Sequence, residues 1–312
     1  MVCFRPLKAY RPREGKKLAF DSKRGYYDQK LELPCGQCLG CRSARSEAWA
    51  IRCVHEAAMS ECRCHPGVRG LHNSFITLTY SPQQLPADLS LDVSHWQKFA
   101  KRLRKARGPF RFFHVGEYGD QSLRPHYHAL LFGLDFPFDS KIFKNTPGRE
   151  LYISDSLTKI WGLGHATWGR VNMETANYVA RYCTKKLRGD LGKAQNVRLN
   201  LATGEEWTVR PEYSTMSRRP GLGTRWFKEF KPDVFPSDEV RLDGRRHRPP
   251  RFYDSLLERE EAEAYTAVKA KRTRAVVDLR SRSTGDEYEA GLQAREAIAK
   301  SRLEIFTTRR EI

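Results

Sequence analysis

The sequence predicts an α+β protein with a central antiparallel sheet flanked by helices, a cysteine-rich N-terminal module and a helical C-terminal tail. Two observations support this fold class. Short β-branched and aromatic runs alternate with amphipathic segments, and turn residues separate them. We expect four segments: a cysteine-rich module with a helix (1–70), a core that carries the sheet (71–192), a basic hairpin and loop extension (193–253) and a charged helical tail (254–312).

Each expected element has a local signal. The strand over residues 75–80 is β-branched and aromatic and ends at Ser81-Pro82. The helix after it begins with a capping box of Ser94 and Gln97 and ends at Gly108. Periodicity and turn residues predict the others: a helix over 43–60, strands over 110–118, 125–133 and 165–171, helices over 154–161 and 173–187, a hairpin within 195–210, basic loops at 217–221 and 245–250, and two tail helices broken near Gly285.

The charge balance is strongly basic. The 312 residues include 56 Lys and Arg against 37 Asp and Glu, a formal net charge of +19, which favours polyanionic partners such as nucleic acid. The candidate DNA contacts are Lys101, Arg102, Arg104, Lys105, Lys186, Arg218, Arg219, Arg245 and Arg246, although a charge run is a solvated face by default. Trp226 and Phe252 lie near these runs and either stack on unpaired bases or pack internally.

The sequence contains no segment typical of a membrane protein. The longest apolar run, which begins at Ala129, is too short for a membrane span, and the N-terminal residues lack the apolar core of a signal peptide. We therefore expect neither a membrane partner nor secretion. Without secretion, the eight cysteines are expected to be thiols or metal ligands rather than disulfides.

Two histidines on the strand over 125–133 form a candidate metal site. His126 and His128 are two residues apart, so their side chains share one face of the strand. If the preceding turn is symmetric about Gln121 and Ser122, Glu117 lies opposite His126 and completes a triad for a divalent cation. A one-residue slip would remove Glu117 from this face, and Asp120 or Gln121 would then be the replacement. Two strand histidines alone are more often packing or surface residues.

The helix over 173–187 carries candidate nucleophiles. Tyr178 and Tyr182 are one turn apart and roughly 150° from an apolar stripe formed by Met173, Ala176, Ala180, Cys183 and Leu187. Lys185 projects from the same side as the tyrosines. Because a tyrosine pKa lies near 10, a phenol needs help to attack at neutral pH, and a metal-polarised phosphate would supply it. Lys185 would stabilise the developing charge. The alternative is that both tyrosines are exposed packing residues.

Several motifs together resemble a known superfamily. The segment 124–133, which contains His126-Tyr127-His128, is similar to the His-hydrophobe-His motif of HUH-type rolling-circle replication initiators, and 75–80 resembles their first motif. The segment 178–186 resembles their two-tyrosine motif. With 34–42 and 213–223 added, residues 1–255 resemble the replication initiators of microviruses, particularly the gokushovirus branch.

The resemblance implies an HUH endonuclease-type fold and a complete activity. A microvirus initiator nicks one strand of a phage origin that is single-stranded or locally melted, using Mg²⁺ or Mn²⁺. It keeps the 5′ end as phosphotyrosine, frees a 3′-OH for the host DNA polymerase, and later religates the displaced strand. The implied location is the cytoplasm of the infected bacterium, with a host helicase and polymerase as partners.

The N-terminal cysteines form a second candidate metal site. Cys35, Cys38 and Cys41 have the spacing to hold one metal, and Cys3 is the nearest fourth ligand. Zinc would pin a segment that otherwise has little core, whereas an iron–sulfur cluster fits the spacing but has no redox role to serve. Ordinary reduced cysteines are the alternative. A further group, Cys53, Cys62, Cys64 and His65, is the less favoured site.

Two other functions fit part of the pattern. A non-catalytic zinc-containing nucleic-acid-binding protein would explain the charge and the cysteines, but it needs neither the tyrosine pair nor the histidine pair. Another HUH enzyme, a relaxase or a single-strand transposase, would use both pairs. Single-strand transposases typically use one tyrosine, so the pair Tyr178 and Tyr182 favours a replication initiator.

Overall fold

The computed structural model describes residues 3–15, 17–61, 72–119, 122–146, 149–185, 196–199, 203–282 and 284–308. The chain divides into two units, Met1–Arg45 with Glu263–Ile312 and Ser46–Ala262. The first boundary falls inside helix α1 (Leu39–Glu61). None of the helices in the described part of the chain combines the length and the apolar character needed to cross a membrane.

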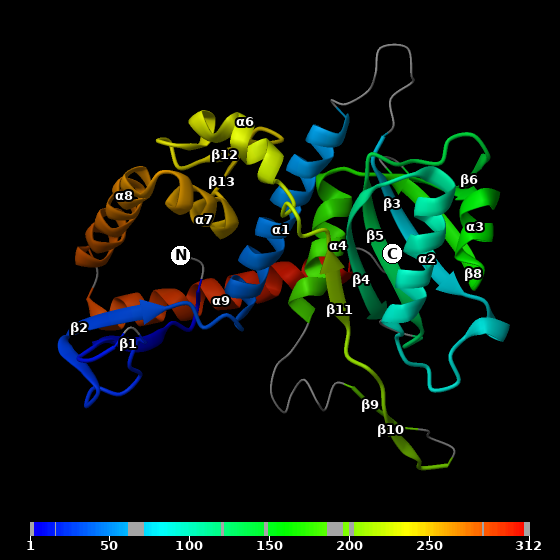
Figure 1. The fold of residues 1–312 in the computed structure, drawn as a ribbon. Coiled ribbons are helices and arrows are strands. Elements are labelled where there is room, and N and C mark those ends of the chain that lie inside the picture. Colours follow the sequence, from blue (N-terminus) through cyan, green and yellow to red (C-terminus); the bar gives the residue numbers. More distant parts are fainter. Residues whose placement is uncertain are drawn as a thin grey trace. The chain divides into compact units, whose positions relative to one another are not determined.

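A seven-stranded antiparallel sheet forms the centre of the larger unit (Figure 1). The strand order is β11-β4-β5-β3-β8-β7-β6, so that β4, β5, β3 and β8 lie inside the sheet and β11 and β6 form its edges. The strands are β3 (Ser74–Tyr80), β4 (Arg111–Tyr118), β5 (Pro125–Phe132), β6 (Ser140–Thr146), β7 (Arg149–Ser154), β8 (Gly164–Arg170) and β11 (Tyr213–Met216). The four strands expected from the sequence are confirmed as β3, β4, β5 and β8.

Both faces of this sheet are covered by helices, because side chains alternate between the faces along each strand. Tyr127 points to a core shared with α2 (Val93–Arg107) and α3 (Asp155–Trp161). Leu130 points to the opposite core, which includes residues of α1 and α4 (Met173–Lys185). Figure 1 shows α2 and α3 on one side of the sheet and α4 on the other. The α+β class and the large antiparallel sheet therefore agree with the sequence prediction.

The start of α2 differs from the prediction. The helix is capped by Asp92, whose side chain accepts a hydrogen bond from the Ser94 backbone N–H at 2.8 Å, so the capping box of Ser94 and Gln97 is wrong. Asp92 has an extended backbone (φ −123°), as an N-cap residue requires, and Ser94 already lies in the first turn. The end of α2 at Gly108 is confirmed, and there φ is +86°. Ser154 caps α3, as its place before that helix suggests.

The extension and the tail also differ in part from the prediction. The hairpin expected within 195–210 is present as β9 and β10, and the helix break near Gly285 separates α8 from α9. The basic stretch expected as a loop at 245–250 instead begins as strand β13, paired with β12. The elements of this region are β9 (Val197–Leu199), β10 (Glu206–Thr208), α6 (Thr224–Val234), β12 (Val240–Leu242), β13 (Arg245–His247), α7 (Arg251–Glu260), α8 (Ala262–Ser281) and α9 (Gly285–Thr308).

The smaller unit contains a β-hairpin of β1 (Leu7–Pro12) and β2 (Gly25–Leu33), together with α8 and α9. Arg5 forms an ion pair with Glu296 of α9 at 3.0 Å, and Lys8 lies 3.9 Å from Glu289 of the same helix. These contacts join the base of the hairpin to α9. The sequence did not predict β1 or β2.

A buried carboxylate joins α1 to the sheet and to the loop after β11. Glu56 of α1 is 1% exposed, accepts a hydrogen bond from Arg111 Nε at 2.5 Å and accepts another from the Gly223 backbone N–H at 2.8 Å. Arg111 Nη2 also donates to the Pro220 carbonyl at 2.6 Å. Because a buried charge without its partner is costly, this network fixes the loop over residues 217–223 on the sheet.

We predict that Glu56→Ala lowers the free energy of unfolding of the larger unit by about 3 kcal/mol, since Arg111 would remain buried without its partner. Urea denaturation followed by tryptophan fluorescence measures this unit alone, because all six tryptophans lie within it. The matched control is Glu239→Ala, which removes an exposed pair with Arg246 and should cost less than about 1 kcal/mol. Equal losses in the two variants would contradict the role of Glu56.

Candidate functional site

The strand register brings a carboxylate and two imidazoles to one face of the sheet. Glu117 of β4 pairs directly with His126 of β5, as the symmetric turn predicts, and Val115 pairs with His128. Paired and alternate residues on antiparallel strands point to the same face. The triad therefore faces the side of the sheet where α1 and α4 pack. Asp120 and Gln121, the alternatives for a slipped register, lie outside the described residues.

The three side chains converge on one point. Glu117 Oε1 lies 2.6 Å from His126 Nε2 and 3.0 Å from His128 Nε2. One ligand atom from each residue can be chosen so that all three lie within 4.8 Å of one another. Each Nε2 atom therefore points at the same carboxylate oxygen, which is the arrangement that a single cation would bridge.

Two further groups orient the imidazoles. The carbonyl of Arg124 lies 3.0 Å from His126 Nδ1, and because a carbonyl only accepts, Nδ1 donates. Thr77 Oγ1 of β3 lies 2.9 Å from His128 Nδ1. Holding Nδ1 by a hydrogen bond directs Nε2 toward a ligand, as in metal sites where a second group fixes the ring. The sequence analysis missed both residues. The signal for Thr77 is its pairing with His128, which is visible only once β3 is aligned with β5.

The site carries a buried negative charge. The Glu117 side chain is 3% exposed, and its Oε2 atom is buried without a hydrogen-bond partner. Burial acts to raise the pKa of Glu117, but the hydrogen bonds with His126 and His128 lower that pKa to about 2. Burial also opposes a charged His126, yet the contact with Glu117 raises the pKa of His126. An ionised carboxylate with an unsatisfied buried oxygen fits a divalent cation, and imidazole and carboxylate are suitable ligands for one.

Helix α4 places Tyr178 beside this triad. The Tyr178 ring contacts the His128 ring edge-on, with centroids 5.2 Å apart, and contacts Phe75 in the same manner at 6.0 Å. The buried stripe of α4 consists of Ala176, Val179 and Ala180, and Met173 is only partly buried. The prediction that Tyr178 points away from the packed face is therefore wrong, because its ring is half-buried against the sheet.

The rest of the predicted nucleophile motif is only partly described. Tyr182 and Lys185 belong to α4, but their side chains lie outside the described residues, as does Cys183. Lys186 and Leu187 are likewise outside the described part. Tyr182 follows Tyr178 by one helical turn, so the two positions share one side of α4.

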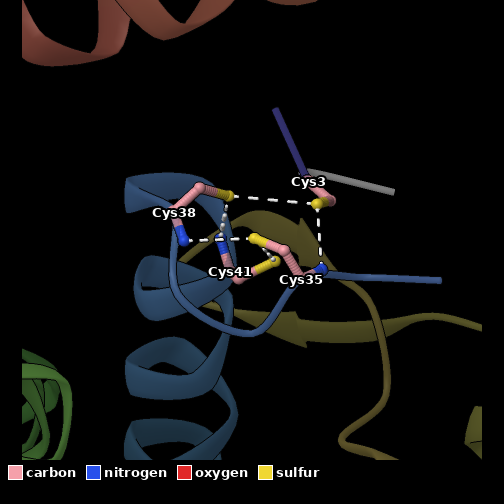
Figure 2. A group of neighbouring side chains, drawn as sticks. All are labelled: Cys3, Cys35, Cys38 and Cys41. Atoms are coloured by element: carbon pink, nitrogen blue, oxygen red, sulfur yellow. Dashed lines mark hydrogen bonds between the residues drawn. The ribbon is translucent and has the colours of Figure 1, made fainter. Parts of the chain in front are cut away.

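Four cysteines of the smaller unit form a compact cluster (Figure 2). Cys3 precedes β1, Cys35 and Cys38 lie in the loop before α1, and Cys41 lies in the first turn of α1. The Sγ atoms of Cys3 and Cys38 are 3.9 Å apart, those of Cys35 and Cys41 are 4.0 Å apart, and all four lie within 4.8 Å of one another. Gly36 permits the tight turn between the first two loop cysteines with a φ of +75°.

These distances match a single tetrahedral ion. With metal–sulfur bonds of about 2.3 Å, a tetrahedron places its sulfur atoms about 3.8 Å apart. A disulfide would bring two sulfur atoms to about 2.05 Å, and a cluster of several irons would hold the thiolates farther apart. Backbone N–H groups also point at the sulfurs, including Cys35 N to Cys3 Sγ at 3.3 Å and Cys38 N to Cys35 Sγ at 3.3 Å.

The thiol pKa values reflect this environment. Burial acts to raise the pKa of Cys38, but the backbone N–H groups of Cys41 and Phe4 lower it to about 7. Burial raises the pKa of Cys41. The cluster therefore already contains one thiol whose ionised form is favoured, and a cation would favour the others. Of the less favoured group, Cys53 is buried in the sheet core, and Cys62, Cys64 and His65 lie outside the described residues.

The predicted DNA contacts on α2 are divided by the packing. Arg102 donates hydrogen bonds to the carbonyls of Ile160 and Trp161, and Arg104 lies over the Phe110 ring at 4.7 Å. Lys101 and Lys105 are exposed. Because α2 covers the face of the sheet opposite the triad, these lysines are not next to Glu117.

The other predicted contacts lie in the extension. Arg218 and Arg219 are exposed on the loop that Glu56 holds, and Arg245 and Arg246 are exposed on β13. Trp226 stacks on His55 with centroids 3.4 Å apart, and Phe252 packs against Arg52 at 3.9 Å. These two aromatics are thus engaged in internal packing rather than presented to bases.

Comparisons with known proteins place the chain in a family. Residues 73–187, which contain the triad and most of α4, match the family model of the replication-associated protein ORF2. The replication-associated protein ORF2 of Spiroplasma virus 4 is 31% identical over 283 residues, which is 83% of this chain and 81% of that protein. The chain belongs to this family of replication-associated proteins.

Two further relatives agree with this membership. The replication-associated protein VP4 of Bdellovibrio phage phiMH2K is 27% identical over 295 residues, which is 90% of this chain and 86% of that protein. The replication-associated protein ORF4 of Chlamydia phage 1 is 28% identical over 247 residues, which is 75% of this chain and 56% of that protein. The resemblance to microvirus replication proteins is thereby confirmed. No solved structure matches the chain.

We predict that the triad binds Mn²⁺ and that His126→Ala with His128→Ala weakens this binding at least about a hundredfold, measured by calorimetry on zinc-replete protein. Loss of one orienting group alone typically costs 10–100-fold, so two direct ligands cost at least that much. Thr77→Val, which keeps the shape of the side chain and removes its hydroxyl, should cost about tenfold. The control is His72→Ala at an exposed position. Unchanged Mn²⁺ affinity in the double variant would refute the site.

Proposed function

We propose that the protein initiates rolling-circle replication of a single-stranded DNA phage by nicking one strand of the phage origin. The observation that carries the proposal is the contact between Tyr178 and the triad. A buried carboxylate and two imidazoles converge within the segment matched by the family, and the Tyr178 ring lies edge-on to His128 at 5.2 Å. Family membership supports a role in replication, and this contact supports a nuclease chemistry for that role.

In the proposed site Glu117, His126 and His128 hold Mn²⁺ or Mg²⁺. When bound, the cation polarises a phosphate oxygen of the DNA and orients the scissile bond. Two imidazoles and one carboxylate favour Mn²⁺ over Mg²⁺ in affinity, whereas the greater abundance of Mg²⁺ in cells acts in the other direction. Thr77 and the Arg124 carbonyl keep the imidazoles aimed at the site.

The proposed reaction is a transesterification. The phenolic oxygen of Tyr178 or Tyr182 forms a bond to phosphorus, and the bond between phosphorus and the 3′ oxygen breaks. The phenol gives its proton to solvent and the departing 3′ oxygen takes one up, so that a 5′-phosphotyrosine and a 3′-OH result. Because the phosphodiester energy is kept in the phosphotyrosine, religation needs no ATP. Lys185 would stabilise the negative charge that develops on the phosphorane.

Two tyrosines serve a cycle in which a second origin is cut while the first end is still attached. Positions 178 and 182 are one turn apart on α4, so one phosphate position can serve both in turn. The freed 3′-OH would be extended by the host DNA polymerase, with a host helicase unwinding the template, in the cytoplasm of the infected bacterium. The predicted basic contacts would bind the phosphates of the origin DNA.

The central prediction concerns the tyrosines. Tyr178→Phe or Tyr182→Phe alone should leave a first nick on an unconstrained single-stranded origin oligonucleotide and impair the full replication cycle. The double variant should form no covalent adduct, because phenylalanine keeps the packing against Phe75 and removes only the nucleophilic oxygen. The measurement is a denaturing gel of the protein–oligonucleotide adduct, with peptide mapping of the attached residue.

The control for this experiment is Tyr26→Phe, which removes a hydroxyl from an exposed tyrosine of the smaller unit and should leave the adduct unchanged. An adduct formed by the folded double variant at the wild-type level would mean that both tyrosines are structural, and the proposed mechanism would be wrong.

We also propose that Cys3, Cys35, Cys38 and Cys41 hold a structural zinc ion. The four thiolates would neutralise the ion and fix the chain before β1 to the start of α1, a region that has few buried apolar side chains. The sulfur spacing supports a single ion over an iron–sulfur cluster.

Freshly purified, reduced protein should therefore contain about one equivalent of zinc, measured by elemental analysis. Cys35→Ser with Cys38→Ser should abolish the zinc, whereas Cys53→Ala should keep it, because Cys53 packs in the sheet core. Chelation should expose the N-terminal region to proteolysis without changing the tryptophan fluorescence of the larger unit. Protein with neither zinc nor iron would refute the site.

A further inference from the structure

The β1–β2 hairpin of the smaller unit exposes an unusual number of aromatic rings. Tyr27 is 66% exposed, Phe20 is 64% exposed and Tyr26 is 44% exposed. Aromatic rings usually pack in a core, and here the protein leaves three of them in solvent within eight residues. Exposed rings of this kind are suited to stacking on flat partners.

The same hairpin carries unpaired positive charge away from its base. At the base, Arg5 and Lys8 face Glu296 and Glu289 of α9. Farther along the hairpin, the described part of the chain provides no carboxylate partner for five exposed cations, which are Arg11, Lys17, Lys23, Arg24 and Lys30. The charge is therefore concentrated where the exposed rings lie.

One cation and one ring lie together. Lys30 Nζ lies over the Tyr27 ring, 4.6 Å from its centroid. An ammonium group beside an aromatic ring offers two complementary surfaces, a charge for a phosphate and a face or edge for a base. Single-stranded nucleic acid presents this alternation of phosphates and bases along its length.

The hairpin is anchored at its base. Leu7 pairs with Leu33, and the cysteine cluster takes Cys3 from just before β1 and Cys35 from just after β2. Both ends of the hairpin are thereby fixed to one point, and Gly25 allows the strands to approach where a side chain would meet Tyr10. A fixed base limits the ordering that binding requires.

We propose that the β1–β2 hairpin is a second DNA-binding site, which holds single-stranded DNA without sequence preference by stacking bases on Tyr27 and Phe20. Arg11, Lys23 and Arg24 contact the phosphates. Charge complementarity selects this occupant, because a second copy of the chain would bring the same positive hairpin and a net charge of +19. The inference rests on the proposed function for the strand that is displaced during replication, but not on the nicking chemistry.

The test compares Phe20→Ala with Tyr27→Ala, made together, against Phe138→Ala. Phe138 is 89% exposed in the larger unit, so the control also removes an exposed ring. Fluorescence anisotropy with a fluorescein-labelled thymidine homopolymer measures binding that does not depend on the origin sequence. The hairpin variant should bind at least about tenfold more weakly, and the control should bind as the wild type does. Equal affinity of the hairpin variant and wild type would overturn the proposal.

A second variant tests the charges. Lys23→Gln with Arg24→Gln should reduce the slope of log affinity against log salt by about 1.4, since each phosphate contact contributes about 0.7 for single strands. An unchanged slope would contradict the phosphate contacts. For the ring variant, a duplex of equal length should lose less affinity than the single strand, because paired bases cannot stack on the rings. An equal loss on the duplex would contradict base stacking.

These outcomes separate the hairpin site from the nicking site. The ring variant should still form the covalent adduct with a saturating short origin oligonucleotide, because the tyrosines and the triad are unchanged. The variant with Tyr178→Phe and Tyr182→Phe should still bind the homopolymer with wild-type affinity. Failure of adduct formation in wild type would reject the proposed function, whereas undiminished homopolymer binding by the ring variant would reject this inference alone.

Discussion

The candidate site depends on the pairing of β4 with β5. The register that places Glu117 opposite His126 also places His128 on the same face, so one set of backbone hydrogen bonds positions all three ligands. A shift by one residue would send Glu117 to the face covered by α2 and would leave the histidines without a carboxylate. The short connection between the strands fixes this register, and β3 on the other side of β5 adds Thr77 behind His128.

The surrounding structure holds the helix that carries the tyrosines against this face. Ala176, Val179 and Ala180 of α4 are fully buried, which brings the helix backbone close to the sheet and sets the Tyr178 ring beside His128. Small residues are needed at these positions, because larger ones would push α4 away from the triad. The catalytic proposal thus follows from ordinary packing: a sheet that fixes the ligands and a closely packed helix that fixes the nucleophile.

Much of this arrangement was predictable from the sequence, for identifiable reasons. The symmetric turn gave the register of Glu117 and His126, and the spacing of Cys35, Cys38 and Cys41 gave the cluster with Cys3. The start of α2 was misjudged because Asp92 and Ser94 both have good capping side chains, and only the backbone conformation decides between them. Strands β1, β2, β6 and β7 were missed because their polar and charged residues do not alternate cleanly with apolar ones. Thr77 could not be assigned because its role depends on a pairing between strands distant in the sequence.

The central claim is that Glu117, His126 and His128 hold a cation against the DNA phosphate. Pulsed electron paramagnetic resonance of the zinc-replete protein loaded with Mn²⁺ and an origin oligonucleotide tests it directly, with the Tyr178→Phe and Tyr182→Phe variant used to prevent turnover. The account predicts nitrogen couplings from two imidazoles and a phosphorus coupling that appears only with the oligonucleotide. A Mn²⁺ signal with no histidine nitrogen coupling, or with no phosphorus coupling at saturating DNA, would contradict the account.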